Sequence, residues 1–217
     1  MSILLTNIRK KNMKIDKVIM SCDDNSNYLD LWPFISKVCK TSGYFNISLI
    51  GQSILTEILI MLSYIEQYGY PDEIYFLTPE TSRNIIYVKK DVKNFISVNM
   101  NSDPESFDIE TVMNSYLNSI VYLKFLESFC TSNNIKLLWS SWDNDELVFF
   151  EKMNFKYFFK LDTPDTNKEI KNIFNLYQDS NQSVELNLIK QDGHKGLIFH
   201  KYWADQFYRK AGYEKNN

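Results

Sequence analysis

Short apolar runs alternate along this chain with longer segments in which apolar residues recur at helical spacing. Short runs bounded by turn residues are typical of buried strands, whereas apolar residues three and four apart are typical of amphipathic helices. The predicted strands are residues 17–20, Phe45–Ile50, Glu73–Leu77, Ile135–Trp139 and Tyr157–Leu161. The predicted helices are Tyr28–Thr41, Ile54–Tyr68, residues 103–130, Asp145–Lys152 and a last helix over Leu197–Tyr208.

This alternation of strands and helices predicts an α/β fold with a parallel sheet covered on both faces. We expect a three-layer sandwich around a central sheet of about five strands. At 217 residues the chain has the length of one domain. We assign residues 1–15 to a lead-in and 16–212 to a single domain, with a polar insertion at about 162–190.

Two segments need a closer description. Ile85–Val88 and Phe95–Val98 could be short strands or a loop that covers the sheet. The helix over 103–130 begins at Asp103-Pro104, where Asp suits the N-cap and Pro the first turn. Its apolar residues are Ile109, Val112, Met113, Tyr116, Leu117, Ile120, Leu123 and Leu126.

The composition argues against several classes of function. Apolar residues make up 44% and charged residues 24%, as in an ordinary globular protein. A formal net charge of −3 argues against nucleic-acid binding through bulk electrostatics. We therefore expect no nucleic acid as a partner. No apolar run is long enough for a signal peptide or a membrane span, so we also expect no membrane as a partner. Three cysteines without a disulfide spacing indicate a reducing compartment, the cytoplasm of the producing cell.

Polar loops follow the predicted strands and precede the last helix. These loops are residues 21–27, 51–53, 78–83, 140–143 and 192–194. In parallel α/β sheets the binding crevice lies at the carboxyl ends of the strands. We therefore expect the five loops to converge on one site.

The two histidines of the chain, His194 and His200, both lie near its C-terminal end. His194 forms an Asp-x-His pair with Asp192 on a glycine-containing loop, and imidazole suits acid–base chemistry near neutral pH. His194 could instead be a solvated loop residue or a helix cap. Because the histidines are six residues apart and no Cys-x-x-Cys occurs, we predict no metal site and no cofactor.

The order of elements and loops resembles the SGNH (GDSL-type) hydrolase family, especially its divergent members from phage genomes, over roughly residues 16–210. Gly51 matches the glycine that follows the second strand in that family. Asp192 and His194 match the pair before its last helix, and His200 with Ala204 resembles the end of that block. The resemblance implies an SGNH- or flavodoxin-like sandwich.

Two blocks depart from the family. Its first strand leads into Gly-Asp-Ser, whereas here the sequence is Ser21-Cys22-Asp23-Asp24, with an aspartate in place of the serine. Its third strand leads to Asn, whereas here the sequence is Thr78-Pro79-Glu80-Thr81-Ser82-Arg83. An aspartate cannot form the acyl-enzyme through a His-activated hydroxyl.

The resemblance implies hydrolysis of carboxylic or acetyl esters, including acetyl groups on carbohydrate. His194 would be the general base, Asp192 the acid that orients it, and Gly51 an oxyanion donor. The nucleophile would be Ser21 or Ser53. Ser53 precedes a predicted helix, which favours an N-cap whose oxygen accepts a backbone N–H over a nucleophile.

Three further polar residues join the candidate site. Arg83 could hold an anionic group or a developing oxyanion, or it could pair with Glu80 on the surface. Asp23 and Asp24 could contact substrate or, with Asp192, bind a divalent cation. Adjacent aspartates in a turn can also simply face water.

Two other functions fit parts of the sequence. The aspartate in the serine position favours a catalytically inactive SGNH-fold protein that binds a glycan or has a structural or interaction role in a phage. Such a protein could be associated with the virion. Val18–Trp32 also resembles phage glycosyltransferase-related sequences, which would make the Asp23-Asp24 turn part of a nucleotide-sugar or metal-dependent transferase.

Overall fold

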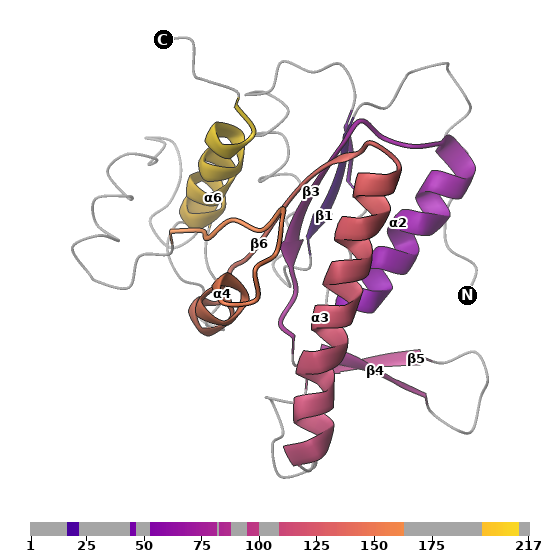
Figure 1. Ribbon diagram of the computed structural model, residues 1–217, viewed down its shortest axis with the longest axis vertical. Helices are drawn as coiled ribbons and strands as arrows, with labels where there is room; N and C mark the ends of the chain where they lie inside the picture. Colours follow the sequence, from indigo (N-terminus) through magenta and orange to yellow (C-terminus); the bar gives the residue numbers. More distant parts are fainter. Residues whose placement is uncertain are drawn as a thin grey trace.

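The computed structural model describes residues 17–21, 44–46, 53–81, 83–87, 95–99, 109–162 and 197–212 (Figure 1). These residues form a mixed α/β fold around a parallel sheet. The predicted helix Tyr28–Thr41, the lead-in 1–15 and most of the polar insertion at 162–190 lie outside the described residues.

The described sheet has four strands in the order β2-β1-β3-β6, and all neighbouring strands are parallel. Its strands are β1 (Lys17–Ser21), β2 (Tyr44–Asn46), β3 (Glu73–Thr78) and β6 (Lys136–Ser141). The four corresponding predicted strands are confirmed within the described residues, and 47–50 lie outside them. β6 continues through Ser140 and Ser141, which we had placed in the following loop.

Four helices are described: α2 (Ile54–Tyr68), α3 (Ile109–Ser132), α4 (Asn144–Glu151) and α6 (Leu197–Lys210). The predicted bounds of α2 are confirmed. Ser53 caps its N-terminus, and Gly69 ends it with φ of 87°, a left-handed conformation that glycine adopts without steric cost. None of the helices in the described ranges combines the length and apolar character needed to cross a bilayer.

The segment between β3 and α3 contains a hairpin. β4 (Arg83–Tyr87) and β5 (Phe95–Asn99) pair antiparallel, from Arg83 opposite Asn99 to Tyr87 opposite Phe95. The strand alternative for this segment is therefore confirmed over the loop alternative. In Figure 1 the hairpin lies beyond the end of β3, beside the N-terminal half of α3.

Alternating side chains of β3 enter two different cores. Ile74 and Phe76 belong to the cluster that α2 and α3 complete, whereas Tyr75 and Leu77 belong to the cluster with α6. Both faces of the described sheet are thus covered. Burial of each large apolar side chain contributes roughly 1.5–3 kcal/mol to the free energy of unfolding, so these clusters hold the layers together.

The predicted fifth strand, Tyr157–Leu161, is reduced to a single parallel bridge between Phe158 and Trp139. Trp139 N donates to Tyr157 O at 3.2 Å, and Phe159 N donates to Trp139 O at 3.1 Å. A strand cannot start earlier here because the N–H groups of Lys156 and Tyr157 donate to the Glu127 carboxylate of α3. Glu127 thereby holds this segment against the edge of β6.

Candidate functional site

The carboxyl ends of β1, β3 and β6 lie side by side and carry hydroxyl residues. Ser21 ends β1, Thr78 ends β3, and Ser141 ends β6. In the register of the sheet Ser21 is opposite Leu77, Leu77 is opposite Ser140, and Thr78 is opposite Ser141. The strand order also changes direction between β1 and β3, because β2 lies on one side of β1 and β3 on the other. Such switch points are where parallel α/β sheets bind ligands.

Ser21 has the position that we predicted, as the last residue of β1 at this switch point. The backbone of Ser21 pairs with that of Leu77 in β3. Thr78, at the end of the neighbouring strand, is fully buried, and its Oγ1 has no hydrogen-bond partner in the described part of the chain. A hydroxyl without a partner can donate to or accept from a ligand that enters the switch point.

Ser53 is the N-cap of α2, which confirms the capping interpretation of this residue. It is buried, with 3% of its surface exposed. Its Oγ accepts from Thr56 N at 3.3 Å and lies 3.1 Å from Thr56 Oγ1. The hydroxyl is therefore held in the first turn of α2, while its proposed role as a nucleophile stays a prediction.

Arg83 is the first residue of β4, where it pairs with Asn99. We had placed it at the end of a polar loop over 78–83, but Thr78 belongs to β3 and Arg83 to β4. The connection between β3 and β4 is therefore four residues long, from 79 to 82. The backbone of Arg83 itself belongs to the hairpin.

The other predicted site residues lie outside the described residues. They are Gly51, Asp23, Asp24, Asp192 and His194. Their convergence with Ser21 and Arg83 stays a prediction. Within the described ranges, no cluster of three or more His, Cys, Asp or Glu side chains is arranged to hold a metal ion.

Sequence reasoning missed Glu146, a buried carboxyl group at the carboxyl edge of the sheet. Thr81 donates to its Oε1 from both the backbone N and Oγ1, the latter at 2.7 Å. Ser141 Oγ donates to its Oε2 at 2.7 Å. Ser115 Oγ of α3 donates in turn to Thr81 O at 2.7 Å. Glu146 thus joins α4 to the end of β6 and to the turn after β3, which α3 also holds.

Burial raises the pKa of Glu146 from its ordinary value of 4.5 to about 7. The hydrogen bonds from Thr81 and Ser141 oppose this rise, and the negative charge of Asp143 adds to it. A carboxyl group with such a pKa can take up or release a proton near neutral pH. Perturbed carboxyl groups of this kind are concentrated at functional sites, although structural networks also contain them.

The local sequence around Glu146 suggests a different role. Asp143-x-x-Glu146 at the start of α4 has the spacing of a capping box, in which the acidic residue three positions on accepts from the N-cap N–H. Asp143 does cap α4, since its Oδ1 accepts from Glu146 N at 3.0 Å. However, Asp143 N donates to Ser141 Oγ at 3.1 Å, which leaves the Glu146 carboxyl group to Thr81.

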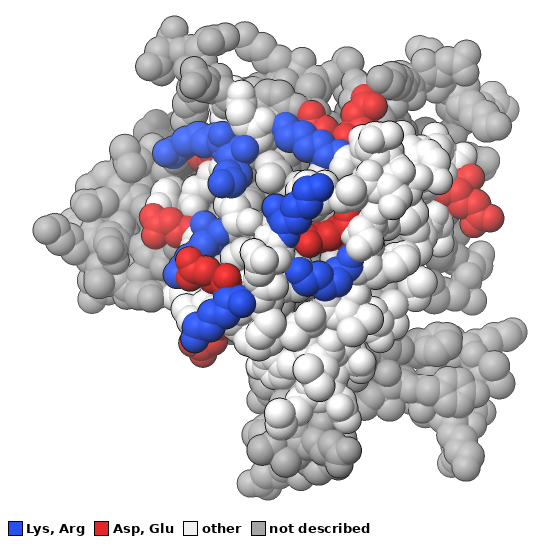
Figure 2. Space-filling view, viewed as in Figure 1, with Lys and Arg blue, Asp and Glu red and all other residues white. Residues whose placement is uncertain are grey.

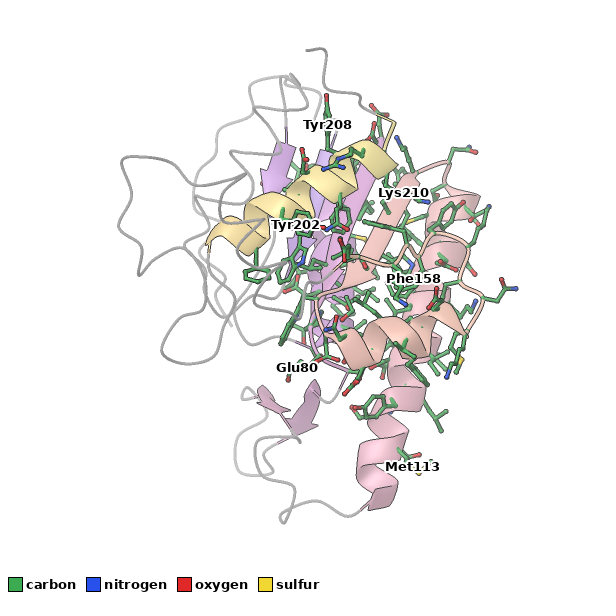
Figure 3. All side chains as sticks on the ribbon, turned by 90° about the vertical axis from the view of Figure 1, so that its left-hand side faces the viewer. Glu80, Met113, Phe158, Tyr202, Tyr208 and Lys210 are labelled. Carbon is green, nitrogen blue, oxygen red and sulfur yellow. The ribbon has the colours of Figure 1, made fainter. Side chains whose placement is uncertain are left out.

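The described elements run in a consistent direction relative to this edge. Lys136 Nζ, at the start of β6, donates to Ala211 O just after α6 at 2.8 Å, so α6 ends at the amino edge of the sheet. Figure 3 shows Lys210 near this end and Glu80 near the opposite end, where β3 finishes. α6 therefore begins on the same side of the sheet as Ser21, Thr78 and Ser141.

These features define a class of protein, a parallel α/β fold with polar groups at the carboxyl edge of its sheet. Comparison of the chain with protein-family models and with curated proteins finds no match.

Proposed function

We propose that this chain is an SGNH-like hydrolase of carboxylic or acetyl esters, with Ser21 as its nucleophile. The observation that carries this proposal is the position of Ser21 at the carboxyl end of β1, next to β3 at the switch point of the sheet. At this end of β1 the adjacent strand β3 finishes in the buried Thr78, and carboxyl ends of parallel strands at a switch point are where such folds bind ligands.

The proposed fold is a three-layer sandwich with five strands, of the SGNH- or flavodoxin-like kind. The parallel order β2-β1-β3-β6 supports it, because it is the order 2-1-3-4 when the parallel strands are counted along the chain. The parallel bridge at Phe158 supports a fifth position beyond β6.

In the proposed mechanism His194 removes the proton of the Ser21 hydroxyl as its oxygen attacks the ester carbonyl. Asp192 orients the imidazole, and Gly51 N–H stabilises the tetrahedral oxyanion. The alcohol leaves with the proton from His194, and water then hydrolyses the acyl-serine by the same route. The direction of α6 supports these roles. Asp192 and His194 shortly precede Leu197 in the sequence, and Leu197 is the first residue of α6, at the end that lies on the carboxyl side of the sheet.

Ser21 is preferred over Ser53 as the nucleophile for a physical reason. The Ser53 hydroxyl caps α2, and its oxygen already accepts from the helix backbone. Attack by this oxygen on a substrate would draw it away from Thr56 N and weaken a cap that is worth roughly 1 kcal/mol. Ser21 is instead the last residue of β1 and caps none of the described helices.

A second proposal follows from one observation in the sequence Ser21-Cys22-Asp23-Asp24, the aspartate that stands where the SGNH family has its serine. It makes the chain an inactive member of the same fold that binds a glycan or has a structural role. In that case the carboxyl edge would recognise its ligand through hydroxyl groups such as that of Thr78, without covalent chemistry.

The test is hydrolysis of 4-nitrophenyl acetate and of a peracetylated sugar by the full chain. We expect Ser21→Ala and His194→Ala to lose activity by about 10³-fold or more, which is the scale for loss of a triad member. Ser53→Ala is the matched control, which should retain turnover and lose about 1 kcal/mol of stability.

Each other outcome selects a different conclusion. No wild-type rate above buffer on either ester would reject the hydrolase and favour the inactive alternative. Loss of activity in Ser53→Ala together with an active Ser21→Ala would move the nucleophile to the start of α2.

A further inference from the structure

The hydroxyl group of Thr78 differs from the other buried serine and threonine hydroxyls of the described ranges. Those ranges bury seven such side chains: Ser53, Thr78, Thr81, Ser115, Ser119, Ser140 and Ser141. Six of the seven hydroxyl groups have a hydrogen-bond partner among the described residues. The Oγ1 atom of Thr78 has none there. A buried hydroxyl without a partner has lost its hydrogen bonds to water, so this exception calls for a physical explanation.

Thr78 lies at the carboxyl edge of the sheet. It is the last residue of β3, and its backbone is opposite Ser141 of β6. Successive side chains of a strand alternate between the two faces of the sheet, so Thr78 shares a face with Ile74 and Phe76. Its hydroxyl is therefore one step beyond the apolar core of this face, at the edge where parallel α/β folds bind ligands.

The residues next to Thr78 in the sheet and in the sequence direct their hydrogen bonds elsewhere. Ser141 Oγ donates to Glu146 Oε2, and Thr81 donates to Glu146 Oε1 from its backbone N and its Oγ1. The carbonyl oxygen of Thr81 accepts from Ser115 Oγ at 2.7 Å. These bonds hold the connection after β3 against α3 and α4. They therefore fix the end of β3 without supplying a partner for the Thr78 hydroxyl.

The part of α3 at this edge has no charge. Residues 111–123, which supply Ser115 to the network, contain no Asp, Glu, Lys or Arg. Figure 2 shows the surface over this half of α3 without charged atoms, while acidic and basic residues gather over the rest of the described face. An ester suits such surroundings, because it is neutral and its oxygen atoms accept the hydrogen bond that a hydroxyl group can donate.

We propose that the Thr78 hydroxyl is a substrate-binding group, which donates a hydrogen bond to an oxygen atom of the bound ester. This role rests on the proposed ester hydrolase. The free protein keeps the hydroxyl buried without a partner, and the substrate supplies the partner on binding. The acceptor is either the acyl carbonyl oxygen or an oxygen of the alcohol part, such as a sugar hydroxyl. A site of this kind discriminates against compounds that lack an acceptor at this point.

The first experiment compares Thr78→Val with Thr81→Val by thermal unfolding of the full chain without substrate. Both threonines are fully buried, and valine keeps their shape and their branching at Cβ. Thr78→Val removes a hydroxyl that has no partner, so its Tm should rise by about 2–4 °C. Thr81→Val is the matched control. It removes a donor to Glu146, so its Tm should fall by about the same amount.

The second experiment measures kcat/KM with 4-nitrophenyl acetate and with a monoacetylated sugar, glucose 6-acetate. Thr78→Val should lower kcat/KM by about 10-fold, because an oxygen atom of the substrate loses its hydrogen bond. A loss with both esters assigns the contact to the carbonyl oxygen that they share, and a loss with the sugar ester alone assigns it to the sugar. Thr78→Ser keeps the hydroxyl and should retain most of the rate. A variant that is more stable but slower is not explained by a structural role of Thr78.

Three outcomes would overturn the proposal. A Thr78→Val variant that loses as much stability as Thr81→Val would mean that the hydroxyl is already bonded in the free protein, for example to a buried water. An active wild type with an equally active Thr78→Val on both esters would reject the substrate contact and leave the proposed hydrolase standing. A wild type without a rate on either ester would reject the hydrolase and this role of Thr78 with it.

Discussion

Glu127 and Glu146 are two buried carboxyl groups in the same fold, with 6% and 5% of their surfaces exposed. Each accepts three hydrogen bonds from described residues. The donors to Glu127 are the indole Nε1 of Trp139 and the backbone N atoms of Lys156 and Tyr157. The donors to Glu146 are the backbone N and Oγ1 of Thr81 and the Oγ of Ser141.

The difference lies in the chemistry of the donors. An N–H group can only donate, so all three partners of Glu127 require an acceptor. Two of the three donors to Glu146 are hydroxyl groups, which can rotate and accept a hydrogen bond from the protonated carboxyl group. Glu127 therefore works as a clamp between α3 and the segment after α4. The Glu146 site can accommodate either protonation state, at the edge of the sheet where we propose that substrate binds.

Replacement of each carboxyl group by its amide should give the largest contrast. In Glu127→Gln an NH2 group faces at least one N–H donor, which leaves a buried donor without an acceptor, and we expect a loss of roughly 1–3 kcal/mol in the free energy of unfolding. In Glu146→Gln the amide oxygen can accept from Thr81 and the NH2 group can donate to Ser141 Oγ. At pH 8 the variant also avoids a buried carboxylate, so we expect no loss.

The measurement is urea denaturation of both variants at pH 8. Glu151→Gln serves as the surface control, because its ion pair with Lys160 is exposed and should contribute little. Equal losses at positions 127 and 146 would show that the type of donor does not decide the cost.

The pH dependence of stability should sharpen the comparison. The pKa of Glu146 is about 7 in the folded protein and near its ordinary value of 4.5 when the chain unfolds. The folded state therefore binds the proton more tightly, and this contribution to stability is present below pH 4.5 and is lost as the pH rises to about 7. Its size is on the order of 3 kcal/mol.

Glu146→Gln has no proton to bind at this position. The free energy of unfolding of the wild type, minus that of Glu146→Gln, should therefore decrease as the pH rises from 4.5 to about 7. Above that pH the difference should stay constant. Denaturation series at several pH values measure it. Parallel profiles for the two proteins would contradict the assignment of this titration to Glu146.

The smallest expected effect concerns the Ser141 hydroxyl. Its hydrogen bond lowers the pKa of Glu146, so Ser141→Ala should raise that pKa further, and the midpoint of the stability profile should move to higher pH by less than about one unit. Ser140→Ala is the control. The Ser140 hydroxyl donates to Phe159 O at 2.6 Å, so its loss should lower stability without moving the midpoint. A similar midpoint shift in both variants would refute the role of the Ser141 hydroxyl.

The sequence predicted the local elements well where short-range signals define them. The bounds of α2 follow from the cap at Ser53 and from Gly69, and both act on the backbone of their own neighbours. The start of α6 at Leu197 and the position of Ser21 at the end of a buried strand also followed from local patterns. The candidate histidine pair lies outside the described residues and stays a prediction.

Contacts between distant segments decided the rest. β6 continues through Ser140 and Ser141 because these residues pair with Leu77 and Thr78 of β3, and neither partner can be read from the strand itself. Likewise, periodicity predicted α3 but could not tell which of its apolar residues face water, and Met113 and Leu117 proved exposed.

What the sequence alone determined about this protein is therefore the succession of strands and helices, because propensity, periodicity and capping act within a few residues. Only the tertiary structure decided the role of Glu146, which a capping-box spacing would have assigned to the start of α4. Its carboxyl group instead meets Thr81, 65 residues away, and is buried there. Both its burial and its hydrogen-bond donors, which together set its pKa, come from this packing of remote segments.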